Sequence, residues 1–120
     1  MKLHSWNELT REQMNDFVVR QVIHGENTTL SRLELKQGAV VPTHHHVNEQ
    51  MTVLVSGKLR FIFPDKTIDL VGGEVMEIAP NLPHRVEALE DSLAIDVFAP
   101  VREDWRRGDD AYLRGGTASA

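Results

Sequence analysis

Cysteine is absent from this chain of 120 residues. Disulfide bonds and thiolate metal sites are therefore excluded, so any metal ion must be bound by imidazole, amide or carboxylate groups. Long apolar runs are absent too: the first residues show no signal peptide, and no window approaches the ~20 apolar residues of a membrane span. We therefore expect a cytoplasmic protein with no membrane partner.

An excess of positive charge is also lacking, because 18 acidic residues outweigh 13 lysines and arginines and give a net charge of −5. This balance argues against nucleic acid as the main partner, and a small molecule fits better. The hydrophobic content of 41% is ordinary for a globular protein. A chain of this length forms a single domain and buries roughly two thirds of its unfolded surface.

Short segments with strand character, separated by turn residues, dominate the chain and predict an all-β sandwich or barrel. We expect about nine strands, at residues 17–23, 28–36, 40–42, 51–55, 59–63, 67–71, 75–78, 84–89 and 93–98. Ser5 and Glu8 have capping-box spacing and predict a short helix to about Met14, although Trp6 could instead pack at a sheet edge. We assign residues 1–16 to this N-terminal segment, 17–100 to the barrel, 101–114 to a C-terminal extension that packs on it, and 115–120 to a disordered tail.

Three consecutive histidines, His44 to His46, indicate a metal site. In a strand, residues two apart point to the same face, so His44 and His46 can offer imidazoles to one ion while His45 points away. Gln50 shares their parity, and His84 follows a proline-rich turn much later. A His-x-His pair alone is common on protein surfaces, so the spacing by itself is weak evidence.

The motif of Gly38, His44-x-His46, Gln50 and Gly57 resembles the first motif of the cupin superfamily, and the segment from Gly73 through 80–84 resembles the second. The resemblance implies a double-stranded β-helix, or jelly-roll barrel, with His44, His46, Gln50 and His84 as metal ligands. Many cupins have glutamate where this chain has Gln50. Its glutamate is Glu49, which strand parity points away from the ion.

The implied ligand set of three imidazoles and an amide oxygen is neutral, so the ion would keep its positive charge and act as a strong Lewis acid. These ligands suit one divalent ion, which could be Ni, Mn, Fe, Cu or Zn. By the same resemblance we expect a homodimer that pairs through outer sheet surfaces, with residues 61–63 or 18–19 contributing.

Segment 93–104 contains an aspartate in an otherwise apolar strand. If Leu93, Ile95 and Val97 pack between the sheets, Ala94, Asp96 and Phe98 face the other way, which in a cupin could be the barrel cavity. A solvent-facing aspartate is the alternative. The run Asp96-x-Phe98-x-Pro-x-Arg102-Glu-Asp resembles the cupin "pectin degradation protein" group, which linearises unsaturated uronates. That resemblance implies that Asp96, Phe98 and Arg102 lie beside the metal.

The residue types fit that chemistry. Arg102 can pair with a substrate carboxylate, Asp96 can act as general acid and base, and Phe98 can exclude water and orient the ring. We therefore predict ring opening of 4,5-unsaturated uronates, sugar acids released from pectin or alginate, to 5-keto-4-deoxyuronates. The alternatives are another metal-cupin oxygenase, lyase or isomerase, and a non-catalytic sugar- or metal-binding cupin.

Overall fold

The computed structural model describes residues 1–115, which fold mainly into antiparallel strands. The ten strands in these residues are β1 (Glu12–Gln13), β2 (Val18–His24), β3 (Thr29–Leu35), β4 (Val40–His44), β5 (Glu49–Ser56), β6 (Lys58–Ile62), β7 (Thr67–Val71), β8 (Val75–Ile78), β9 (His84–Ala88) and β10 (Ser92–Ala99). Three short helices complete the described part: the 3-10 helix η1 (Trp6–Glu8), α1 (Glu103–Arg106) and α2 (Ala111–Arg114). The all-β prediction is confirmed.

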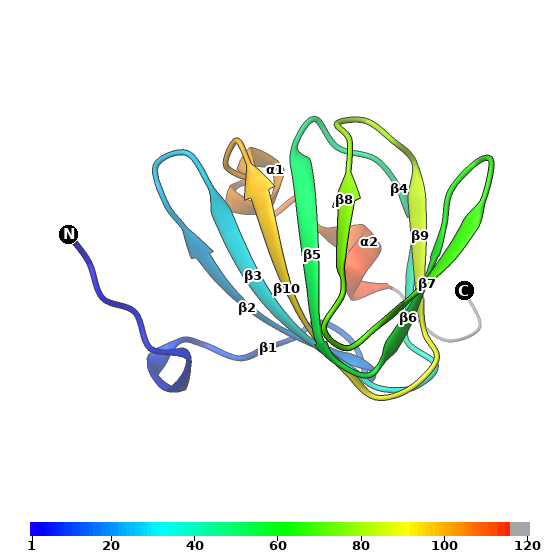
Figure 1. The fold of residues 1–120 in the computed structure, drawn as a ribbon. Helices are drawn as coiled ribbons and strands as arrows, with labels where there is room; N and C mark the ends of the chain where they lie inside the picture. The colour runs from blue at the N-terminus through cyan, green and yellow to red at the C-terminus, as the bar shows by residue number, and fades with distance from the viewer. Residues whose placement is uncertain (116–120) are drawn as a thin grey trace.

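The strands form two sheets that face each other. The larger sheet has the order β1-β2-β3-β10-β5-β8, and the smaller has the order β4-β9-β6-β7. Figure 1 shows the two sheets close together at one end and farther apart at the other, with α2 between them on the open side. A site built between the sheets can therefore draw residues from both of them and from the C-terminal segment.

The core lies between the two inner faces and contains large apolar side chains from both sheets, such as Leu54, Phe61 and Ile78. Phe61, Phe63 and Val18, which were expected in a dimer interface, point into this core and are at most 8% exposed. Contrary to one expectation from the sequence, Leu93, Ile95 and Val97 of β10 do not pack between the sheets. Ala94, Asp96 and Phe98 face inward, while Leu93, Ile95 and Val97 lie half-buried on the outer face.

The predicted helix from Ser5 to Met14 is wrong. Only the three residues of η1 are helical, and Ser5 makes no side-chain cap. Residues Glu12–Gln13 instead pair with β2, which adds a tenth strand, and the buried Met14 donates its backbone N–H to the Val18 carbonyl. Sheet pairing and burial of Met14 therefore override the local helix signal.

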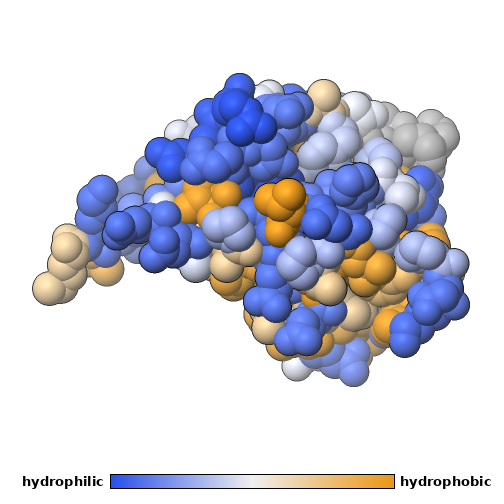
Figure 2. Space-filling model, turned by 90° about the horizontal axis from the view of Figure 1, so that it is seen from above, coloured by the Kyte–Doolittle hydropathy of each residue, from blue (hydrophilic) through white to orange (hydrophobic). Residues whose placement is uncertain are grey.

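The N-terminal arm stands out from a mainly hydrophilic surface (Figure 2).

The histidine segment is not one continuous strand, as the parity argument assumed. β4 ends at His44 in the smaller sheet, and β5 begins at Glu49 in the larger sheet, so residues 45–48 form a loop that crosses between them. The return from β5 to β6 is tight at Gly57, where φ is +96° and a Cβ atom would collide with the Ser92 side chain and the Asp91 carbonyl. Glycine is needed there because only it avoids both penalties.

The C-terminal extension begins after a cis Ala99–Pro100 peptide and places α2 against β4. Val101, Trp105 and Leu113 of this segment are buried. The disordered tail expected at 115–120 falls, after Gly115, outside the described residues. Within residues 1–115, no helix is long and apolar enough to cross a membrane.

Candidate metal centre

Three histidines meet at the open end of the two sheets. His44 is the last residue of β4 and pairs in register with His84, the first residue of β9, while His46 comes from the crossing loop. One ligand atom of each histidine lies within 4.8 Å of the others, so the three are placed to bind a metal ion. The backbone N–H of Asn81, a residue with φ of 62°, donates to the His46 carbonyl at 2.7 Å and ties the two histidine loops together.

Each of the three imidazoles is oriented by a backbone carbonyl. The Nδ1 atoms of His44, His46 and His84 lie 2.8, 3.0 and 2.8 Å from the carbonyl oxygens of Pro42, Asn48 and Leu82. A carbonyl oxygen only accepts hydrogen bonds, so each Nδ1 must carry the proton. Each Nε2 then carries a free lone pair that can bind a metal ion. A hydrogen bond from Nδ1 to a backbone carbonyl is typical of metal-binding histidines.

The Nε2 atoms have few partners within the described protein. His84 Nε2 is buried and has no hydrogen bond there. His46 Nε2 lies 3.0 Å from Gln50 Oε1. Gln50 is held in that orientation because its Nε2 donates to Thr52 Oγ1 at 2.9 Å, and Thr52 in turn donates to Asp96 Oδ1 at 2.6 Å. Lone pairs of Gln50, His46 and His84 therefore lie close together without a proton between them, and the donor set fits a divalent ion.

Burial keeps these histidines neutral. It lowers the pKa of His44 to about 3 and that of His46 to about 4, and it also lowers the pKa of His84. A neutral imidazole is the form that binds a metal. The neighbouring residues His45 and Glu49 are both exposed, as the sequence predicted, and lie outside this arrangement. The parity of β5 accounts for Glu49, whereas the position of His45 follows from the loop.

Asp96 lies inside the barrel on β10, opposite Thr52 of β5. It is 6% exposed, and burial raises its pKa to about 6. Its Oδ1 accepts hydrogen bonds from Thr52 and, at 3.5 Å, from Gln50. Oδ2 has no hydrogen bond among the described residues, and Asp96 lines the cavity beside the histidines. A carboxyl group with this pKa exchanges protons readily near neutral pH.

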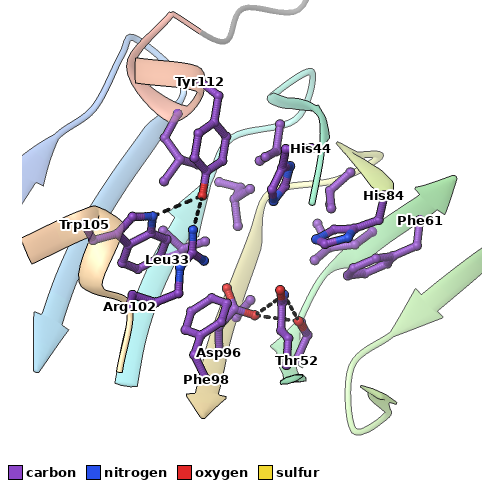
Figure 3. Close-up of a pocket in the computed structure, with 17 residues that line it drawn as sticks. Leu33, His44, Thr52, Phe61, His84, Asp96, Phe98, Arg102, Trp105 and Tyr112 are labelled. Carbon is purple, nitrogen blue, oxygen red and sulfur yellow. Dashed lines mark hydrogen bonds between the residues drawn. The ribbon is translucent and has the colours of Figure 1, made fainter. Parts of the chain in front are cut away.

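Arg102 is 1% exposed, so it is a buried cation at the cavity wall. Its guanidinium carbon lies 4.6 Å from the Phe98 ring centroid and 4.1 Å from that of Trp105. Nε and Nη2 donate to the two carboxylate oxygens of Asp104 at 3.0 and 2.8 Å. Nη1 donates no hydrogen bond within the described residues. The structure thus brings Asp96, Phe98 and Arg102 to one cavity with His44, Gln50 and His84 (Figure 3).

Two aromatic residues of the site were not found from the sequence. The Tyr112 ring stacks on His44, with centroids 4.4 Å apart and an angle of 27°, and its hydroxyl accepts hydrogen bonds from Arg102 Nη2 and Trp105 Nε1. Tyr112 and Trp105 both line the cavity, whose volume is about 40 Å³. Thr52 was also missed, although it shares the parity of Gln50 on β5. The polar sequence around Trp105 and Tyr112 carries no signal for a cavity wall.

Two antiparallel sheets around a three-histidine cluster define a β-barrel protein whose open end has three histidines placed to bind a metal ion. The cupin domain family matches residues 31–98, which is more than half of the chain. The protein therefore belongs to the cupin family.

Solved structures agree with this assignment. KdgF from Halomonas sp. is 24% identical over 87% of this chain and 99% of its own, with a TM-score of 0.80. An RmlC-like cupin from Shewanella frigidimarina is 20% identical over 88% of this chain and 96% of its own, with a TM-score of 0.81. Oxalate decarboxylase from Bacillus subtilis, described with Mn(II) centres, is 20% identical over 82% of this chain but only 29% of its own, with a TM-score of 0.75. These likenesses show the fold. No curated protein sequence matches the chain.

Proposed function

We propose that this protein is a metal-dependent enzyme that opens the ring of 4,5-unsaturated uronate monosaccharides. The observation that carries the proposal is the position of Asp96: a buried carboxyl group with a pKa of about 6, joined to Gln50 through Thr52 and facing the same cavity as Arg102. The cavity thus combines a proton-transfer group, a carboxylate-binding group and a metal site. An unsaturated sugar acid requires all three.

The reaction is an isomerisation, so no atom is gained or lost. The substrate is a cyclic enol ether with a carboxylate on C5 and a hemiacetal hydroxyl on C1. Loss of the C1 hydroxyl proton allows the C1–O5 bond to break with its electron pair left on O5, which gives an aldehyde at C1 and an enolate at C5. Transfer of that proton to C4 then converts the enolate into the 5-keto-4-deoxy product. One residue that first accepts and then donates a proton can serve both steps.

We assign the proton transfers to Asp96, whose Oδ2 has no hydrogen-bond partner among residues 1–115. Arg102 is assigned to the substrate carboxylate because its Nη1 is available at the cavity wall, while Asp104 fixes the guanidinium plane. Phe98 is assigned to the wall that orients the sugar ring, since it packs against both His46 and Arg102. His44, His46, Gln50 and His84 would bind a divalent ion, which when bound stabilises enolate-like negative charge.

The run from Asp96 to Asp104 resembles the pectin degradation group, and the barrel resembles KdgF in fold. Both similarities support the uronate assignment. Its test is the incubation of the metal-loaded protein with unsaturated galacturonate and mannuronate monomers, with and without chelator. Loss of the ultraviolet absorbance of the conjugated double bond should be fast, and chelator should abolish it. Unchanged absorbance with fully loaded protein would reject the proposal.

The size of the cavity favours a second candidate. About 40 Å³ accommodates only a few water molecules, so a smaller carboxylate could be the substrate, as the fold similarity to oxalate decarboxylase suggests. Release of carbon dioxide from oxalate, with no change in the uronates, would support this candidate instead.

We also propose that the protein forms a homodimer through the outer face of the larger sheet. Apolar side chains continue across three neighbouring strands of this face, where Ile95 pairs with Val53 and Val53 pairs with Val75. Val55 and Val75 are 52% and 55% exposed. A continuous apolar sheet face of this kind marks a protein interaction surface.

A further inference from the structure

Tyr112 closes the candidate site from outside the barrel. It stands on α2, after the cupin-matched residues 31–98, and its ring covers His44 at a centroid distance of 4.4 Å. Its hydroxyl accepts hydrogen bonds from Arg102 Nη2 at 2.9 Å and from Trp105 Nε1 at 3.1 Å. Figure 3 shows Tyr112 reaching down toward Arg102 between Trp105 and His44. One side chain thus contacts both the metal site and the proposed carboxylate site.

The space behind Tyr112 is too small for a sugar acid. The cavity measures about 40 Å³, which is room for a few water molecules but not for a sugar ring. Most of the cavity wall belongs to the two sheets, whose backbone hydrogen bonds make it rigid. The exception is the C-terminal segment, which contributes Arg102 and Trp105 and, from a helix of only four residues, Tyr112 and Leu113. Enlargement of the cavity therefore requires movement of this segment.

The attachment of α2 to the barrel rests on a small number of mostly polar contacts. Asp110, which is 3% exposed, precedes the helix and binds Arg20 Nη2 at 2.9 Å and Arg114 Nε at 2.9 Å. Leu113 is the one buried residue of α2. Gly108, with φ of 80° and no atom within 4 Å of the place where a Cβ would stand, lies two residues before Asp110. Further contacts of α2 are those of Tyr112 and one hydrogen bond from Asn15 Nδ2 to the Leu113 carbonyl at 2.8 Å. A helix of four residues held by so few contacts opens at lower free energy than a paired strand.

We propose that Tyr112 is the gate and a specificity-determining residue of the site. In the closed state its hydroxyl holds the hydrogen-bond donors of Arg102 and Trp105. When α2 moves out, the carboxylate of the entering ligand takes these donors in place of the hydroxyl, in addition to the Nη1 donor of Arg102. The gate thus favours small molecules with a carboxylate over neutral ones, because a carboxylate accepts the hydrogen bonds that Arg102 and Trp105 lose when Tyr112 leaves. The gating itself depends on the fold alone, while the identification of the ligand as a sugar acid rests on the proposed function.

The gate can be tested without any substrate. Zn(II) uptake and its removal by a chelator are measured for the full-length protein, for Tyr112→Ala, and for Asp110→Asn, which loosens α2 without lining the cavity. Both rates should rise at least about 5-fold in each variant while the equilibrium affinity stays within about 2-fold, as expected when a barrier is lowered and not a ligand lost. Arg107→Ala, an exposed change in the same segment, should alter neither rate. Unchanged rates in Tyr112→Ala and Asp110→Asn would overturn the gate.

The exchange of hydrogen bonds is tested with galacturonate, a saturated sugar acid. The chain has two tryptophans, so Trp6→Phe leaves Trp105 as the reporter. Saturating galacturonate should increase acrylamide quenching of Trp105 in the Zn(II)-loaded protein, and Tyr112→Phe, which lacks the competing hydroxyl, should bind galacturonate about 3- to 10-fold more tightly. Weaker or unchanged binding in Tyr112→Phe, or failure of the wild type to bind galacturonate, would overturn the proposed exchange. Fast metal exchange in the gate variants together with absent uronate turnover would reject the proposed function and leave the gate in place.

Discussion

The Nε2 atom of His46 lies 3.0 Å from Oε1 of Gln50. Only lone pairs lie between these two atoms, because the hydrogen atoms of both groups point to other partners. The carbonyl of Asn48 fixes the proton of His46 on Nδ1, and Thr52 fixes the amide of Gln50. Two acceptors this close repel each other unless a cation lies near them. We therefore propose Gln50, and not Glu49, as the oxygen ligand of the metal ion.

Substitution of Gln50 by glutamate should tighten metal binding and slow turnover. The added carboxylate attracts the ion, but it lowers the positive charge available to the substrate and removes the N–H donor to Thr52. We expect kcat to fall about 10- to 100-fold, measured with the Zn(II) affinity of the same sample. The matched control is Glu49→Gln, an exposed change that should leave both values intact. Equal effects of the two substitutions would contradict the assigned donor.

Asp96→Asn should abolish proton transfer while the metal site survives. We expect kcat to fall about 10²- to 10⁴-fold with metal affinity preserved within a few-fold. An Asp96→Asn protein that still turns over the uronate at the wild-type rate would contradict the role of Asp96.

Thr52→Val tests the same residue through its pKa. Thr52 donates a hydrogen bond to the carboxylate at 2.6 Å and thereby lowers a pKa that burial raises to about 6. Without this donor the pKa of Asp96 should rise, so the acidic limb of the kcat/KM profile should move to higher pH. Thr67→Val, at an exposed position of β7, is the control. An unmoved acidic limb would show that Asp96 does not control the profile.

Arg102→Lys should weaken substrate binding more than it slows the chemistry. Lysine keeps the charge but lacks the planar guanidinium. The guanidinium pairs with Asp104 through two nitrogens and keeps a third nitrogen available at the cavity wall. We expect KM to rise by about 10-fold or more, read from initial rates. Arg106→Lys, on the exposed side of α1, should leave KM unchanged. A wild-type KM in Arg102→Lys would remove Arg102 from the carboxylate site.

The metal-free protein should lose stability as the pH falls below 7. Burial lowers the pKa of His44 to about 3, whereas the unfolded chain has an ordinary value near 6.5. Between these values the unfolded state binds more protons, so acid favours unfolding. Asp96 acts in the opposite direction between about 6 and 3.8, because its folded pKa is raised.

The contribution of His44 is separated from that of Asp96 by comparison with His44→Gln. The difference in the free energy of unfolding between pH 7.5 and pH 5, measured in urea with chelator present, should shrink by about 1–2 kcal/mol in this variant. The exposed His45→Gln should retain the wild-type pH dependence. An identical pH dependence in His44→Gln and wild type would contradict the buried neutral imidazole.

Ile95→Lys should disrupt the proposed dimer. Ile95 lies in the apolar outer face of the larger sheet, beside Val53, and a charged residue there would have to be buried against the partner. Sedimentation velocity should show a dimer for the wild type and a monomer for Ile95→Lys. Asp69→Lys, on the exposed edge strand β7 of the other sheet, should remain dimeric. A monomeric wild type would reject the interface.

Most strands were predictable because alternation and turn residues are local signals. The sequence placed β2, β3 and β6 to β10 close to their observed bounds, and the parity of β5 correctly sends Gln50 inward and Glu49 outward. The same local reasoning failed at His46. A strand running from His44 to Gln50 would keep parity, but the chain leaves one sheet and enters the other between them. The three imidazoles meet because of this crossing.

The C-terminal part of the site was beyond local reasoning for another reason. Trp105 and Tyr112 lie in a charged segment without apolar periodicity, and their positions depend on contacts with residues far away in the sequence. Arg20 lies 4.7 Å from the Trp105 ring centroid, and Tyr112 stacks on His44. Such contacts become visible only when the whole barrel is assembled.

The most direct test of the central claim is to follow the metal-loaded protein with 4,5-unsaturated galacturonate by NMR in D₂O. Ring opening through Asp96 should give a product of unchanged carbon skeleton with a ketone at C5 and a solvent-derived deuterium at C4, formed only with metal present and with Asp96 intact. An unaltered double bond, a gain of oxygen from O₂ or a loss of carbon dioxide would contradict it.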